Sequence, residues 1–262
     1  TCGSPYYSWR YYNYLIMSTL VVYPDAGHGS SSVDGSAYRG SVDETFANII
    51  AGAGTGRQYS NASNALVRLQ ASTTTNQFQT NIRSIFTFVT SSLTSAATIS
   101  DVSLSLYGSD KGLGVGSPNL HVVASTPASD YDVVNGDYSQ LGSTSFGSVT
   151  YANFSTSGYN DITLNSSGIA NVSKTGVSKF GAKFSWDLDG TFGGTWSSGA
   201  YSYLRGYYAD QTGTTNDPKL TITYTTVVGP ANLKSINGLA SASIKSVNGL
   251  AMASIKSFNG VT

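Results

Sequence analysis

The sequence predicts an all-β protein whose antiparallel strands form a β-sandwich of the jelly-roll type. Three observations favour this fold class. Tyrosine and glycine are abundant, with 18 and 29 of 262 residues, and Ser, Thr and Asn are common, which is typical of strands and turns. Glu44 is the one glutamate among fourteen acidic residues, so a residue type that favours helices is nearly absent. Short runs of alternating apolar and polar residues recur between turn clusters.

The strands are predicted from these alternating runs, taken in chain order. The clearest run is 98–107, where serine residues separate Val102, Leu104 and Leu106. The other predicted strands are 14–23, 66–70, 84–89, 120–124, 161–164, 180–186, 201–207 and 220–224. A short helical turn is predicted at 166–174. About ten strands joined by polar turns are typical of a sandwich.

Three segments are expected along the chain. Residues 1–17 form an N-terminal assembly arm, 18–228 the jelly-roll domain, and 229–262 a tail of three 11-residue repeats. The arm is an aromatic extension of the first strand. Its aromatic side chains include Tyr6, Tyr7, Trp9, Tyr11 and Tyr12.

The tail repeats predict β-hairpins, because each contains Asn-Gly, the strongest two-residue hairpin signal. A turn at Asn248-Gly249 places large residues opposite small ones and gives a thin apolar face for packing against another sheet. The expected opposite pairs are Val247 with Leu250, Ile244 with Ala253, and Ala242 with Ile255. Three alternatives remain open, which are a small solenoid, strands wrapped between subunits, and a flexible linker.

The low charge limits the classes of partner. Charged residues make up 11% of the chain and the net charge is zero, so we expect no nucleic-acid partner. No stretch reaches the roughly 18 consecutive apolar residues of a membrane helix, so no transmembrane segment is expected. A low net charge favours self-association over repulsion between copies.

The residues that carry chemistry are few, and no enzyme is expected. The chain has two histidines and one cysteine, Cys2, and no paired carboxylates stand out by spacing. Calcium is the most plausible inorganic ligand, as a structural ion. Asp187 and Asp189 are its candidate ligands, because alternate side chains of a strand point the same way. As turn formers, these residues also need no metal.

Exposed aromatic residues give a second class of candidate site. Trp196, Tyr201, Tyr203 and Arg205 are close in sequence and could bind a glycan. The alternative is that the alternating tyrosines line a strand face that packs in the core or at an interface.

The middle of the chain resembles the DNRLRE-type jelly-roll domains of secreted and phage-borne proteins, which are related to carbohydrate-binding modules. The resemblance covers roughly residues 18–226 and rests on strand motifs in a fixed order. These are Asp34-Gly35, then 83–88 (RSIFTF), 98–107 (TISDVSLSLY) and the closing strand 217–224 (DPKLTITY). The tail looks like C-terminal repeats of phage structural proteins and microbial surface proteins. The resemblance implies a structural or adhesive role rather than catalysis.

These observations lead to two functional hypotheses. The first is a self-assembling structural subunit of an extracellular filament or phage fibre, whose terminal extensions pair with copies of the same chain. Its expected assembly residues are Tyr6, Tyr7, Trp9, Tyr11, Tyr12, Ala242, Ile244, Ala253, Ile255 and Phe258. The second is a carbohydrate- or receptor-binding module. Both place the protein outside the cell, on a cell surface or on a virion.

Overall fold

The computed structural model describes residues 15–27, 31–59 and 62–227, together with four two-residue strands between 235 and 251. The all-β prediction is confirmed, because antiparallel strands dominate these residues. By contacts, the chain divides into two compact units. The larger unit, residues 19–95 and 99–223, holds the candidate sites described below. The smaller unit comprises residues 1–18, 96–98 and 224–262.

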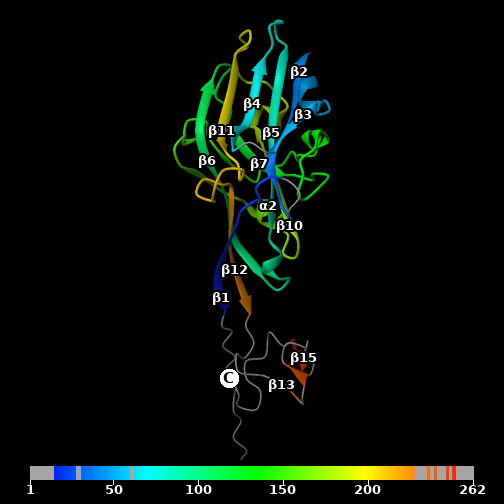
Figure 1. The fold of residues 1–262 in the computed structure, drawn as a ribbon, viewed down its shortest axis with the longest axis vertical. Helices are drawn as coiled ribbons and strands as arrows, with labels where there is room; N and C mark the ends of the chain where they lie inside the picture. The colour runs from blue at the N-terminus through cyan, green and yellow to red at the C-terminus, as the bar shows by residue number, and fades with distance from the viewer. Residues whose placement is uncertain are drawn as a thin grey trace, which may run out of the picture. The chain divides into compact units, whose positions relative to one another are not determined.

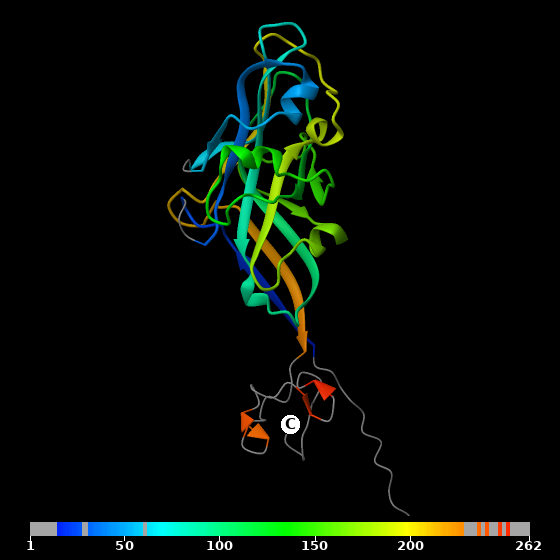
Figure 2. The same ribbon diagram turned by 90° about the vertical axis from the view of Figure 1, so that its right-hand side faces the viewer.

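Twelve strands form one hydrogen-bonded sheet, which curls on itself as Figure 1 and Figure 2 show. Along its main path the order is β1-β12-β6-β11-β4-β5-β10-β7-β8, while β2 joins β3 to β5 and β9 pairs with β6. The strand bounds are β1 Leu15–Val22, β2 Asp34–Glu44, β3 Gly56–Gln58, β4 Ser63–Ala71, β5 Phe78–Val89, β6 Thr98–Leu113, β7 Leu120–Ala124, β8 Gly147–Val149, β9 Tyr159–Thr163, β10 Val177–Phe184, β11 Tyr201–Tyr207 and β12 Lys219–Val227.

Strand β6 turns from one part of the sheet to another. Its segment Ser103–Tyr107 pairs with β9, whereas Gly108–Leu113 pairs with β11. The β11 register shifts between Arg205 and Gly206, which marks a β-bulge at this place. A bulge bends a strand and increases its twist, so it helps the sheet to curl.

Three short helices interrupt the strands. They are α1 Phe46–Ala51, α2 Ser166–Ala170 and α3 Ser185–Asp189. Thr45 caps α1, because its hydroxyl oxygen accepts a hydrogen bond from the Asn48 amide at 3.3 Å. Gly190 ends α3 with a left-handed φ of 71°, which a residue with a side chain rarely adopts.

The core contains large apolar side chains, and both faces of strand β5 are buried in it. Its largest fully buried members include Phe86, Phe88, Phe180, Leu104 and Tyr138. Strand β5 is buried along most of its length, as expected for a strand at the centre of the sheet.

The structure confirms most predicted strands and corrects one. All eight predicted strands outside 180–186 coincide with a strand, and the predicted turn at 166–174 contains α2. The segment 180–186 was predicted as strand throughout, but β10 ends at Phe184 and helix α3 begins at Ser185. Strands β2, β3 and β8 and helix α1 had no strong local pattern and were not predicted.

In the tail, the described residues form two antiparallel pairs of two-residue strands, of which β13 and β15 are labelled in Figure 1. Strand β13 (Ser235–Ile236) pairs with β14 (Leu239–Ala240), and β15 (Ser246–Val247) pairs with β16 (Leu250–Ala251). Val247 lies opposite Leu250. The expected pairs further from the corner lie outside the described residues. The aromatic arm and the other expected assembly residues also lie outside them.

Candidate functional sites

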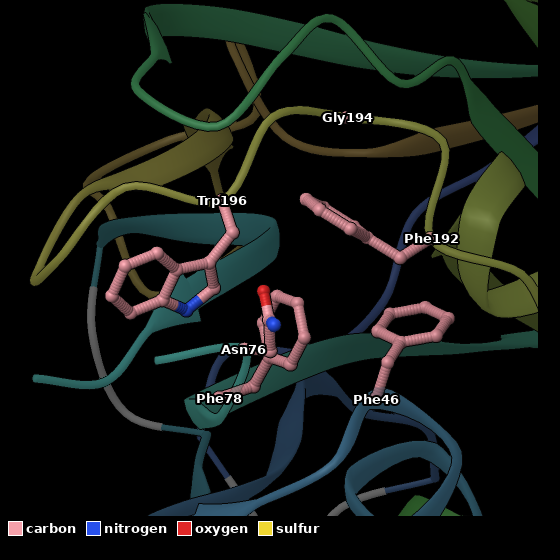
Figure 3. Close-up of a pocket in the computed structure, with 6 residues that line it drawn as sticks. All are labelled: Phe46, Asn76, Phe78, Phe192, Gly194 and Trp196. Atoms are coloured by element: carbon pink, nitrogen blue, oxygen red, sulfur yellow. The ribbon is translucent and has the colours of Figure 1, made fainter. Parts of the chain in front are cut away.

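An aromatic pocket of about 370 Å³ lies where α1, the β4–β5 turn and the loop before β11 meet. Figure 3 shows the aromatic rings grouped around it. The lining residues are Phe46, Asn76, Phe78, Phe192, Gly194 and Trp196. Rings that line a pocket and a nearby amide are what a small ligand with apolar faces and hydroxyl groups requires.

The rings of the pocket hold one another in place. The Phe78 and Phe192 centroids are 4.9 Å apart at an interplanar angle of 67°, and Phe46 lies 5.4 Å from Phe78. These edge-to-face arrangements are the favoured ones for aromatic pairs. Trp196 is fixed by its Nε1, which donates to the Gln77 carbonyl oxygen at 2.8 Å. These contacts fix the lining rings relative to one another, so the pocket is preformed.

A second candidate site is the Tyr–Arg face, formed by Arg68, Tyr201, Tyr203 and Arg205 on the outer side of β4 and β11. Alternation along β11 places both tyrosines on this side, and Tyr203 lies opposite Arg68 across the strand pair. The tyrosine rings are 5.5 Å apart. The Arg68 guanidinium lies 4.4 Å from the Tyr201 ring centroid, and that of Arg205 lies 5.6 Å from the Tyr203 centroid.

The pairing of β11 with β4 and β6 brings the residues of the Tyr–Arg face together, and no local sequence motif predicts this pairing. Tyr203 lies across Gly112 of β6, where any larger residue would displace the ring. Its hydroxyl donates to Asp110 Oδ2 at 2.7 Å, and this hydrogen bond raises the pKa of Tyr203. Burial lowers the pKa of Arg68, and its Nε–H is buried without an acceptor from the described chain.

The structure therefore divides the predicted glycan-binding residues between two sites. Trp196 belongs to the aromatic pocket, whereas Tyr201, Tyr203 and Arg205 belong to the Tyr–Arg face. The sequence did not single out Phe46, Phe192 or Arg68, which come from distant segments. No local pattern in the sequence marks them, because Phe46 lies in α1 and Arg68 in the middle of β4.

The calcium pair was predicted on a strand, but the structure has a helix there, so calcium binding by this pair stays a prediction. Because 185–189 is helical, side chains two residues apart point in different directions, so Asp187 and Asp189 do not share a side. Asp187 is buried, and both its oxygens accept from Arg83, at 2.6 Å from Nε and 2.7 Å from Nη2. Asp189 is exposed at the helix end. In the described residues, no three His, Cys, Asp or Glu side chains converge as metal ligands.

Arg83 is the centre of a buried polar network. Its remaining donors reach the carbonyl oxygens of Tyr138 at 2.6 Å and Ile50 at 2.7 Å. Burial opposes its charge, but the Asp187 carboxylate outweighs burial and raises the pKa of Arg83. The Lys183 amine is 3.9 Å from Asp187 Oδ1, and burial lowers its pKa. The network is a closed set of matched donors and acceptors, which is typical of a structural role.

The two histidines are separate from these sites as far as the structure describes them. His121 lies on β7, where burial lowers its pKa and its Nδ1 is 2.8 Å from the Ser145 hydroxyl. His28 lies outside the described residues.

The edge strand β1 exposes large apolar side chains. The exposed fractions are 60% for Leu15, 49% for Ile16, 71% for Met17 and 43% for Val21. Strand β1 ends the main path of the sheet, so one side of its backbone has no partner strand in the described chain.

Comparisons with known proteins give no family for the chain. No family model matches it, and no curated protein matches it. The resemblance to DNRLRE-type domains therefore stays a prediction. None of the helices in the described residues has the length and apolar character needed to cross a membrane.

Proposed function

We propose that the protein is a structural subunit that assembles with copies of itself when strand β1 pairs with the sheet of a neighbour. The subunit is non-catalytic, has a jelly-roll domain and belongs to a filament or fibre outside the cell or on a virion. The observation that carries the proposal is the exposed edge strand β1, with its row of apolar side chains. Such an edge is a template for pairing with another chain.

The edges of the sheet differ in a way that supports directional pairing. Strand β1 has eight residues, whereas the other strands with one partner in the large sheet, β3, β8 and β9, have three, three and five. Short edge strands offer few unpaired backbone groups, which limits pairing there. A long edge that pairs with a different surface of the next copy makes a head-to-tail contact, which generates a filament when it does not close.

The electrostatics of the chain fit this role. Fourteen basic and fourteen acidic residues give a net charge of zero, so copies are not repelled at long range. The proposal does not depend on the arm and the tail, although the sequence predicts that both add contacts.

The test is sedimentation velocity of the full chain over a concentration series, with electron microscopy of the same samples. Met17→Lys places a charge on the edge and is expected to weaken association by at least ~10-fold, about 1.4 kcal/mol. Leu113→Lys is the matched control, because Leu113 is 58% exposed but lies on β6 rather than on the edge. Unchanged assembly of Met17→Lys, or equal losses in both variants, would contradict the proposal.

A second candidate function is binding of a carbohydrate in the aromatic pocket. The specific observation is that preformed aromatic rings and Asn76 line one cavity. The Tyr–Arg face supports this function less well, because the guanidinium groups of Arg68 and Arg205 lie over the tyrosine rings on which a sugar would stack.

A glycan array probed with the full chain tests this second function. Trp196→Ala removes a ring of the pocket and is expected to abolish saturable binding, while Tyr203→Ala, on the Tyr–Arg face, keeps it. Tyr131→Ala is the control for a lost exposed aromatic ring, since Tyr131 is 49% exposed and does not line the pocket. An array with no bound glycan, or binding that survives Trp196→Ala, would contradict carbohydrate binding in the pocket.

A further inference from the structure

Two aspartates of the loop between β11 and β12 lie close enough to Asp34, the first residue of β2, to act on its charge, and we call the three the acidic cluster. Asp34 begins β2, Asp210 lies in the loop after β11, and Asp217 lies just before β12. The backbone amide of Ala209 donates to Asp34 Oδ2 at 2.9 Å, and the amide of Gly27 donates to Asp210 Oδ1 at 2.8 Å. The loops after β1 and β11 are thereby joined, and they lie side by side in Figure 2.

The cluster contains carboxylate oxygens that the protein leaves without a donor. In the described part of the chain, five buried side-chain atoms have no hydrogen-bond partner, and two of them are Asp34 Oδ1 and Asp210 Oδ2. The Asp34 side chain is fully buried, with 0% exposed. A buried oxygen of this kind is costly unless it is protonated or meets a positive group.

The cluster also has no neutralising side chain among the described residues. The charges that act on Asp34 are those of Asp210 and Asp217, and both oppose its ionisation. Burial, reinforced by these carboxylates, raises the pKa of Asp34 well above its usual range, and burial raises the pKa of Asp210 and of Asp217. The described ion pairs all involve other acidic residues, namely Glu44, Asp130, Asp132 and Asp187.

We propose that the acidic cluster binds a calcium ion through Asp34 Oδ1 and Asp210 Oδ2, with Asp217 adding negative charge. The donors are oxygens only, and calcium accepts carboxylates together with hydroxyl groups, backbone carbonyls and water from flexible loops. A transition metal such as zinc prefers nitrogen and sulfur ligands, which this cluster lacks. Among the described residues no three His, Cys, Asp or Glu side chains form a metal-binding group, so the proposed site has two carboxylate ligands, and neutral oxygens would complete the coordination.

The ion would tie the loops that flank β1 and β12 to the start of β2. Asp34 is on β2, Asp210 is bonded to the loop that follows β1, and Asp217 leads into β12. Calcium binding is therefore expected to stabilise the region from which the edge strand β1 departs.

The test is a calorimetric calcium titration of the EDTA-stripped full chain, with the melting temperature followed in parallel. We expect saturable binding at one site and a calcium-dependent rise in melting temperature. Asp34→Asn and Asp210→Asn are each expected to weaken binding by at least ~10-fold, a loss known even for residues behind metal ligands. Asp101→Asn is the control, since Asp101 is an exposed aspartate outside the cluster.

Circular dichroism shows whether each variant folds. If Asp34→Asn fails to fold, Asp210→Asn carries the test, because Asp210 is only half-buried. No heat and no change in melting temperature up to about 10 mM calcium, above the range of weak extracellular sites, would overturn the proposal. Binding that survives both cluster variants, or that is lost in Asp101→Asn, would also overturn it.

Discussion

Asp187 and Asp34 are both buried carboxylates of the larger unit, yet the chain surrounds them differently. Asp187 faces the Arg83 guanidinium through two hydrogen bonds and has the Lys183 amine 3.9 Å away. Asp34 receives one backbone hydrogen bond and has Asp210 and Asp217 as its charged neighbours. The first site is neutralised by the protein, whereas the second accumulates charge of one sign.

The difference teaches that burial alone does not define the role of an acidic residue. A buried carboxylate with a matched cation is part of the framework, and removing either partner leaves an unpaired charge. A buried carboxylate without a cation needs a proton or an external ion, so it is sensitive to solution conditions. The two sites should therefore respond in opposite directions when a charge is removed.

The largest expected loss of stability comes from breaking the ion pair between Asp187 and Arg83. Arg83→Met leaves Asp187 buried without its partner and is expected to destabilise the fold by about 3–5 kcal/mol. Urea unfolding of the full chain measures this loss. The matched control is Arg205→Met, an exposed arginine of β11, which should change stability by no more than about 0.5 kcal/mol. Equal small effects in both variants would mean that the buried pair does not hold the framework.

Removing the charge of Asp34, which has no cationic partner among the described residues, should change the free energy of unfolding in the opposite direction. Asp34→Asn keeps an oxygen for the Ala209 amide and removes a buried charge, so without calcium near neutral pH the variant is expected to be at least as stable as the wild type. Asp187→Asn, the same substitution in the paired site, is expected to cost about 3–5 kcal/mol. A large loss in Asp34→Asn would show that this carboxylate has a partner.

The smallest effect is expected from an exposed carboxylate. Asp110 accepts a hydrogen bond from Tyr203 at the surface, where water can replace either group. Asp110→Asn should change the free energy of unfolding by no more than about 0.5 kcal/mol. This variant sets the baseline for the comparison, and a loss as large as that of Asp187→Asn would show that the assay does not distinguish buried from exposed charge.

The sequence predicted the framework of the sheet because strand formation leaves a local signal. The alternation of Val102, Leu104 and Leu106 predicted β6, and all three side chains are buried. The prediction was wrong at 185–186, where α3 begins, because a short apolar segment gives similar signals for strand and helix.

The sites were harder to predict because they depend on long-range register. Trp196 was singled out, but its pocket partners Phe46 and Phe78 lie more than a hundred residues earlier in the chain. Asp187 was expected to bind a metal from its spacing to Asp189. Its actual partner, Arg83, is 104 positions away in the sequence, so no local pattern indicates the ion pair. The acidic cluster joins the first residue of β2 to the loop between β11 and β12, and no spacing pattern in the sequence indicates that they meet.

The most direct test of the contrast is the pH dependence of stability in EDTA, measured as the melting temperature of the wild type minus that of Asp34→Asn. Below about pH 4, both folded and unfolded states hold the Asp34 proton, and its contribution to stability is fully present. As the pH rises through the raised pKa of the folded state, this contribution is lost. The account predicts that the wild type loses stability relative to Asp34→Asn as the pH rises from about 4 towards 8. A difference that does not change with pH, or that grows in favour of the wild type, would contradict an uncompensated Asp34.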